Sequence, residues 1–121
     1  MVNVKNLLTR MMERMTTTTE TPSITGITAG SLVEAYVVQN GKTVTLTLGV
    51  KKSTATAVNA NVFAGTLELA YRPRYLVNGV GYAGSSAGVL QLLGTGALNI
   101  HIVGAQLAAN TTIYVSTTYV I

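Results

Sequence analysis

Apolar and polar residues alternate with a period of two along most of the chain after residue 23. In the clearest run, 43–50, valine or leucine occupies every second position and threonine or glycine the positions between them. This alternation is typical of a β-strand with one buried face. An Asn-Gly pair at 40–41 separates this run from a second strand-like run at 32–39. The pair predicts a β-hairpin with a type I′ turn, because both central residues of that turn need positive φ.

Further segments with the composition of short strands lie at 57–63, 65–69, 76–83, 88–93, 97–103 and 111–121. Seven to eight strands at this spacing, with no helical pattern among them, favour an all-β fold. The specific expectation is an antiparallel, jelly-roll-like β-sandwich over residues 24–121. Several strands, such as 97–103, have apolar residues on both faces. A single sandwich buries one face of each sheet, so the surplus predicts a homo-oligomer.

The N-terminal residues have a different pattern from the β-domain. Apolar residues recur there at helical spacing, and the stripe consists of Leu7, Leu8, Met11, Met12 and Met15. The spacing predicts a short amphipathic α-helix over residues 1–15. A helix this short is marginal alone in water, so its stripe is expected to dock on another surface. Residues 16–23 are threonine-rich and include a proline, and they are expected to form an extended linker.

Charge is scarce in this chain. Charged residues make up 10% of the sequence, with eight basic and four acidic residues and a net charge of +4. The basic residues are scattered and form no stripe interleaved with aromatic residues, so nucleic acid is not an expected partner. The apolar runs are far shorter than the ~20 residues needed to span a membrane, so no membrane insertion is expected.

The residue types that are missing limit the chemistry. The sequence contains no Asp and no Cys, and His101 is its single histidine. A Ser-His-Asp triad and a zinc site of three or four ligands are therefore not expected. Glu34 and Glu68 are the only acids in the β-domain, so a glycosidase pair would have to be these two. We expect no enzymatic activity, no metal and no cofactor.

Four short motifs follow one another in the β-domain. They are Asn-Gly-Lys at 40–42 followed by alternating apolar residues, Tyr-Arg-Pro at 71–73 within the segment 65–77, a glycine-bounded apolar run at 88–96, and Ser-x-Thr-Tyr at 116–119. In this order they make residues 30–121 similar to the small C-terminal head domains of tailed-bacteriophage fibres, receptor-binding proteins and minor structural proteins.

The resemblance implies a homotrimer that is made in the bacterial host cytoplasm and becomes part of the virion. Its N-terminal helix, 1–15, would either form a short three-stranded bundle with its copies or attach to other virion proteins. The head would bind a host-surface saccharide and serve host attachment. The alternative is a purely structural trimerisation or capsid-decoration module without a ligand of its own.

Two groups of candidate residues follow from the sequence. The first is expected at the trimer interface or in a structural role, and it comprises Tyr71, Arg72, Pro73, Arg74, Tyr75, His101 and Tyr119. Arginine and tyrosine in the 71–75 segment could also hold anionic sugars or phosphate. The second group is expected in loops, where amides, hydroxyls and a tyrosine ring suit a neutral sugar. It comprises Asn59, Asn61, Tyr82, Ser85, Ser86 and Asn110.

Overall fold

The computed structural model describes residues 17–121, which form nine β-strands and one short 3-10 turn. The strands are β1 (Thr17–Glu20), β2 (Ile24–Ala29), β3 (Ser31–Asn40), β4 (Thr43–Lys51), β5 (Asn61–Leu67), β6 (Val77–Ala83), β7 (Ser86–Leu92), β8 (Ala97–Gly104) and β9 (Ile113–Val120). The turn η1 (Leu69–Tyr71) follows β5. The all-β expectation is confirmed. The helix expected at 1–15 lies outside the described residues.

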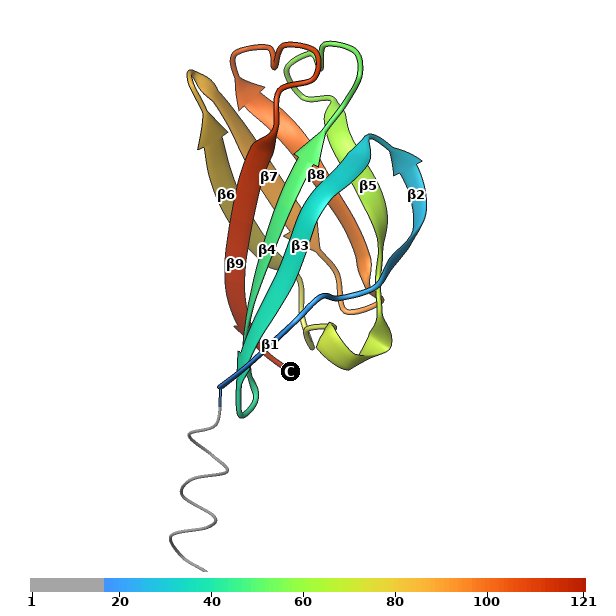
Figure 1. Cartoon of the computed structure of the whole chain (residues 1–121), viewed down its shortest axis with the longest axis vertical. Coiled ribbons are helices and arrows are strands. Elements are labelled where there is room, and N and C mark those ends of the chain that lie inside the picture. Colours follow the sequence, from blue (N-terminus) through green and yellow to red (C-terminus); the bar gives the residue numbers. More distant parts are fainter. Residues whose placement is uncertain (1–16) are drawn as a thin grey trace, which may run out of the picture.

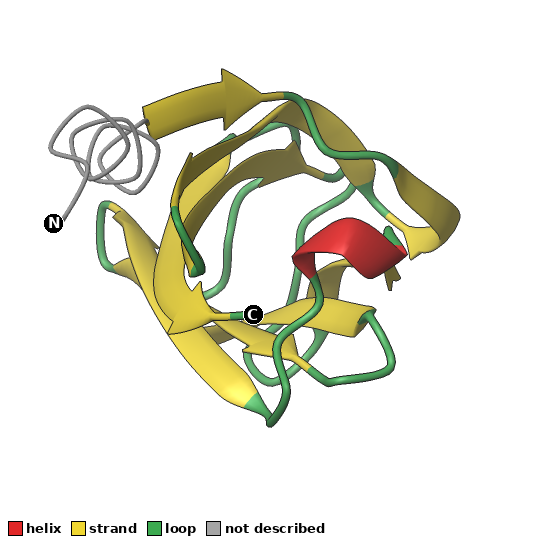
Figure 2. Cartoon of the chain, turned by 90° about the horizontal axis from the view of Figure 1, so that it is seen from below, coloured by secondary structure: helices red, strands yellow, loops and turns green. Residues whose placement is uncertain are grey.

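All nine strands belong to one antiparallel sheet with the order β1-β3-β4-β9-β6-β7-β8-β5-β2. The sheet curls into a half-barrel, so its two halves face each other across a common interior (Figures 1 and 2). The expected sandwich of two separate sheets with seven to eight strands is therefore corrected to one curled sheet of nine. Two strands were expected at 57–63 and 65–69, but residues 61–67 form the single strand β5, residues 57–60 lie in a loop, and β1 and β2 were not expected.

The strands β6 and β9 meet at a seam, where Val80 and Ser116 are the only residues in ladder register. Gly79 and Gly81 of β6 point toward β9. A Cβ atom at Gly79 would lie 2.4 Å from the Ser116 carbonyl oxygen, and one at Gly81 would lie 1.5 Å from that of Tyr114. Glycine therefore lets the two backbones approach closely at the pairing that joins the two halves of the sheet.

The core fills the space between the two halves of the sheet. Alternate residues of β4, β7, β8 and β9 point inward, as the period-two pattern predicts. The largest side chains that are completely buried include Phe63, Leu46, Leu48, Leu90 and Ile100. Strands from both halves thus share one hydrophobic core.

The hairpin predicted at Asn40-Gly41 is present, but its turn is shifted by one residue. Asn40 pairs with Thr43, so Gly41 and Lys42 occupy the two central positions. Gly41 has φ of +60°, and Lys42 is not among the residues with positive φ. This pattern is that of a type II′ turn, which needs glycine only at its first central position. The expected type I′ turn was wrong.

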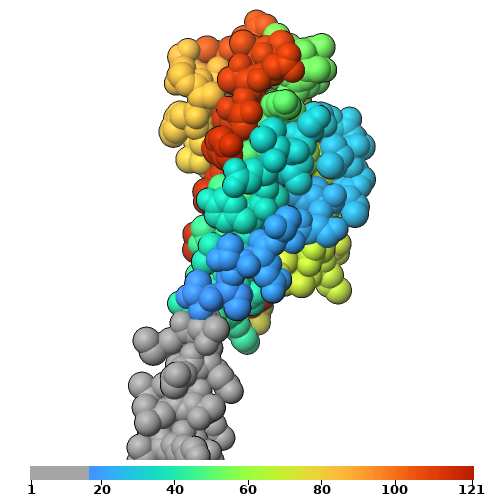
Figure 3. All heavy atoms as spheres, in the orientation of Figure 1, coloured from blue at the N-terminus to red at the C-terminus, as the bar shows by residue number. Residues whose placement is uncertain are grey.

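The threonine-rich segment expected as a linker is partly a strand. Residues 17–20 form β1 and pair with the end of β3, which is consistent with the preference of β-branched residues for strands. The next residues are held by the start of η1: the Ser23 amide donates to Glu68 Oε2 at 2.5 Å, and the Glu68 amide donates to the Ser23 carbonyl at 3.0 Å. Residues 17–29 thus run across one side of the body (Figure 3).

The body has two distinct ends. We call one end the base; it contains the 41–42 turn, the segment 68–76 and the loop 93–96, and the Ile121 amide bonds to the Lys42 carbonyl there. The opposite end, the tip, consists of the loops 52–60 and 105–112 and the 84–85 turn (Figure 1). The chain thus enters β1 at the base and presents its longest loops at the tip.

Candidate functional site

The two long loops of the tip are tied together by backbone hydrogen bonds. Thr56 and Leu107 exchange two such bonds, of 2.9 and 3.0 Å, and the Asn110 amide donates to the Lys52 carbonyl at 2.8 Å. These bonds connect residues about fifty positions apart in the sequence. The loops are therefore one assembled surface, as a recognition site on a rigid scaffold requires.

The turn between β6 and β7 reaches the same end of the molecule. Tyr82 and Ser85 are exposed there, and Tyr82 keeps 72% of its surface accessible. Ser86 is buried, and its Oγ donates to the Gln106 carbonyl at 3.1 Å. Five of the six residues expected to bind a ligand are thus exposed at or near the tip, whereas Ser86 connects the turn to the neighbouring loop.

The asparagines of the tip have a conformational role as well. Asn59 and Asn110 have φ of +69° and +59°, and they are the only non-glycine residues with positive φ among residues 17–121. Asparagine tolerates this left-handed region better than most residues. Their side chains are exposed, and so is that of Asn61 at the start of β5. The tip therefore offers amide groups whose positions are set by the loop backbone.

Thr56 carries an unpaired hydroxyl beneath these loops. The residue is only 1% exposed, and its Oγ1 has no hydrogen-bond partner among the described residues. We expect Thr56→Val to raise the free energy of unfolding by about 1 kcal/mol, because the variant removes an unpaired buried polar group at nearly constant shape. Urea denaturation measures the change, with Thr54→Val at an exposed position of the same loop as the control. A loss of stability specific to Thr56→Val would show that the hydroxyl has a partner.

At the base, Tyr71 and Tyr119 join three segments of the chain. The Tyr71 hydroxyl donates to Glu20 Oε2, and the Tyr119 hydroxyl donates to the Tyr71 carbonyl at 2.6 Å. The hydrogen bond to Glu20, together with burial, raises the pKa of Tyr71 to about 12. Burial also raises the pKa of Tyr119. The two tyrosines thus fasten β1, η1 and β9 to one another within a single chain.

The remaining residues of the 71–75 segment differ in exposure. Pro73 is buried, and the Arg72 Nε donates to the Leu67 carbonyl at 2.9 Å. Arg74 and Tyr75 are exposed, and Tyr75 has 81% of its surface accessible. Of the expected interface residues in this segment, only Arg74 and Tyr75 have side chains that are free to meet a partner. The other residues stabilise the base of their own chain.

His101 lies on the outer face of β8 and is partly exposed, so it is not a core residue. It stands opposite Asn61 of β5 on one side and Val89 of β7 on the other. Among residues 17–121, no group of three or more His, Cys, Asp or Glu side chains is placed to hold a metal ion. The same part of the chain contains no helix long and apolar enough to cross a membrane.

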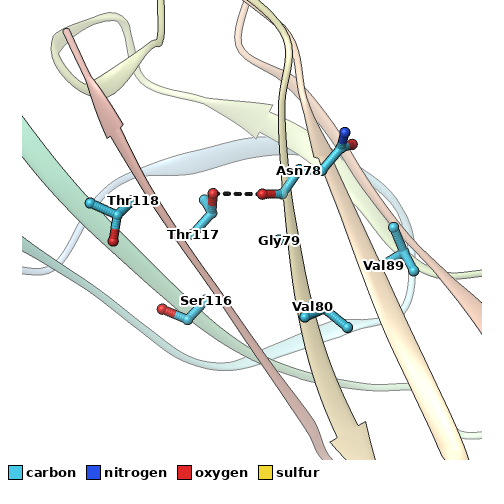
Figure 4. A pocket seen from close by; sticks show the side chains of 7 residues that line it. All are labelled: Asn78, Gly79, Val80, Val89, Ser116, Thr117 and Thr118. Atoms are coloured by element: carbon cyan, nitrogen blue, oxygen red, sulfur yellow. Dashed lines mark hydrogen bonds between the residues drawn. The ribbon is translucent and has the colours of Figure 1, made fainter.

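An open groove of about 480 Å³ follows the outer side of the seam between β6 and β9. Its lining residues are Asn78, Gly79, Val80, Val89, Ser116, Thr117 and Thr118. Across the seam, the Thr117 hydroxyl donates to the Asn78 carbonyl at 2.8 Å (Figure 4). A second groove of about 360 Å³ shares Thr118 and continues along Val120 to Tyr75 at the base.

The sequence interpretation missed this groove. Its signal is the alternation of glycine with larger residues at 78–82, which in a strand indicates close approach of another backbone. The lining carries hydroxyl, amide and valine groups and no charged side chain. Its chemistry suits an uncharged surface or ligand better than an ion.

No family model matches this chain, and no curated protein is similar enough to it to count as a match.

Proposed function

We propose that this chain is a non-enzymatic structural protein of a tailed-phage virion, in which it forms the homotrimeric head of a fibre or appendage. The head binds a host-surface saccharide through its tip. The N-terminal segment, 1–15, contacts other virion proteins. The motifs at 40–42, 71–73, 88–96 and 116–119 support the proposal through their similarity to phage head domains.

The observation that carries the proposal is the polarity of the body. The segment before β1 joins the body at the base, and the assembled loops lie at the opposite end (Figure 1). A head on an appendage needs this arrangement, because the end that attaches to the particle must leave the recognition end free. The tip also carries the residue types that bind neutral sugars, namely an exposed tyrosine ring with nearby hydroxyl and amide groups.

The full-length protein tests this function by its binding to saccharides. We expect binding to a glycan array or to cell-wall saccharide fractions of the host. The double variant Tyr82→Ala, Ser85→Ala should weaken that binding at least about tenfold, because truncating an aromatic hot-spot residue costs about 2 kcal/mol or more. Thr95→Ala, an exposed hydroxyl deletion in the base loop 93–96, should leave it unchanged.

Two other results would redirect the proposal. A protein that is found in purified particles by immunogold labelling but binds no saccharide would be the trimerisation or decoration module without a ligand. A protein that is absent from particles would not be a virion component, and the proposal would be wrong.

A further inference from the structure

Four adjacent strands of the sheet carry no charge. No Lys, Arg, Asp or Glu occurs after Arg74, so β6, β7, β8 and β9 contain none of these residues. The charged residues of the described chain are Glu20, Glu34, Lys42, Lys51, Lys52, Glu68, Arg72 and Arg74. They lie on β1 and β3, in the 41–42 turn, at the end of β4 and in the segment 68–74. The strands on one side of the body are therefore uncharged, and Arg74 lies beside this side only at the base, where it lines the second groove with Thr118 and Val120.

The outer face of this uncharged side mixes apolar side chains with neutral polar ones. We call it the β6–β9 wall and define it by the outward residues of β9, β6 and β7 that lie below the tip: Tyr114, Ser116, Thr118, Val120, Asn78, Val80, Ala87, Val89 and Gln91. Val80 is 49% exposed and Val120 is 57% exposed. Val80 lies at the centre, since it is in register with Ser116 on β9 and with Val89 on β7. Exposed valines at the centre and at one end of an uncharged face are consistent with an interaction site.

Association through the edges of the sheet is disfavoured. The edge strand β1 has only four residues and ends on Glu20. Where β1 stops, β3 continues with a register irregularity between Leu32 and Glu34, and Glu34 is exposed. At the other edge, the pairing of β2 with β5 is irregular between Thr25 and Ala29. Short strands, bulges and charges of this kind disfavour the addition of further strands, so for residues 17–121 association through a face of the sheet is favoured.

The chemistry of the wall fits a second copy of this chain. Residues 17–121 contain five Lys or Arg side chains and three Glu side chains, so the charged part of the surface carries an excess of positive charge, which disfavours contact between identical copies there. Copies that meet through the wall keep most of this charge apart. An acidic or basic partner would find no opposite charge on the wall itself. The seam groove in its centre supplies a hollow for such a contact, and the half-exposed Tyr114 on β9 supplies an aromatic ring.

We propose that the β6–β9 wall is the surface through which copies of this chain associate, with Val80 at its centre. This inference rests on the homotrimer of the proposed function, and it replaces the buried residues Tyr71, Pro73 and Tyr119 as interface residues. Because all copies present their tips in one direction on an appendage, the contact runs along the wall from base to tip.

The test is a charge placed in the wall of the full-length protein. Val80→Glu should weaken self-association at least about 100-fold and convert the trimer to monomers in sedimentation velocity, because a buried carboxylate would lose water without gaining a partner. Val80→Thr should remain trimeric. Ile27→Glu is the matched control, since Ile27 is 44% exposed but lies on β2, on the opposite side of the body. Ser116→Glu is a second variant, which should act as Val80→Glu does.

Crosslinking gives an independent measurement. The sequence contains no cysteine, so Val80→Cys carries one thiol per chain. A short bifunctional thiol reagent should link Val80→Cys chains and leave Ile27→Cys chains unlinked.

The results of these experiments distinguish a failure of the β6–β9 wall as the interface from a failure of the proposed virion function. If Val80→Glu and Ser116→Glu remain trimeric with wild-type affinity, the wall is not the interface, although the virion function stands. If Val80→Glu dissociates a trimer that is absent from particles, the wall is the interface and the function is wrong. A wild-type chain that sediments as a monomer contradicts both the wall and the trimeric head.

Discussion

Gly81→Ala is expected to destabilise the protein by about 3 kcal/mol or more, or to prevent it from folding. The added Cβ would lie 1.5 Å from the Tyr114 carbonyl oxygen and 3.0 Å from the Val115 Cα. Both atoms belong to the backbone of β9, which cannot rotate away as a side chain could, so the clash cannot be relieved locally. Relief requires the seam between β6 and β9 to open, and this seam joins the two halves of the sheet. Guanidinium denaturation measures the loss.

Gly49→Ala is the control for this variant. Its Cβ would also be crowded, at 2.5 Å from a ring carbon of Tyr114. That ring is half-exposed and can rotate away, so we expect a change of about 1 kcal/mol or less. If Gly81→Ala does not fold, Gly79→Ala gives a measurable intermediate case, since its Cβ would lie 2.4 Å from the Ser116 carbonyl oxygen. Equal stability of Gly81→Ala and wild type would contradict the close seam.

The second large effect is a loss of stability in alkaline solution. The folded pKa of Tyr71 is about 12, against an ordinary value of 10.0, and burial shifts the pKa of Tyr119 in the same direction. Between pH 10 and pH 12, the Tyr71 and Tyr119 hydroxyls lose their protons in the unfolded chain but keep them in the folded chain. The free energy of unfolding is therefore intact below pH 10 and falls as the pH rises toward 12. The slope is about 1.4 kcal/mol per pH unit for each tyrosine involved.

Urea denaturation at a series of pH values between 8 and about 12 measures this slope. The double variant Tyr71→Phe, Tyr119→Phe should lose most of the pH dependence, whatever its stability at neutral pH. Tyr75→Phe removes an exposed hydroxyl of the same segment and should keep the wild-type slope. An unchanged slope in the double variant would mean that other groups cause the alkaline loss.

Local sequence patterns were sufficient for most of the strands. The alternation in 43–50 predicted β4 and its buried face, and the runs at 32–39 and 97–103 correspond closely to β3 and β8. This success has a local cause, because a strand with one buried face must alternate in polarity wherever its partners are. β1 and β2 were missed since their residues are almost all exposed and so show no apolar alternation.

The candidate site was predictable only in part. Loop chemistry pointed to Asn59, Tyr82 and Asn110, and the structure places all three at or near the tip. The sequence could not show that the Ser86 hydroxyl turns inward and donates a hydrogen bond to the Gln106 carbonyl. It also could not show that the hydroxyls of Tyr71 and Tyr119 donate hydrogen bonds to partners about fifty positions away. Neither could it show the seam groove, whose two sides come from strands that are separated in the sequence by β7 and β8.

Residue types and short-range periodicity are enough to identify an all-β chain with little charge and with a hairpin near residue 41. These properties hold in any tertiary arrangement. That the strands form one curled sheet, with the uncharged strands side by side, becomes visible only in the folded chain. Pairing between distant strands depends on where backbones can approach, and at the seam Gly79 and Gly81 permit an approach that any side chain would prevent.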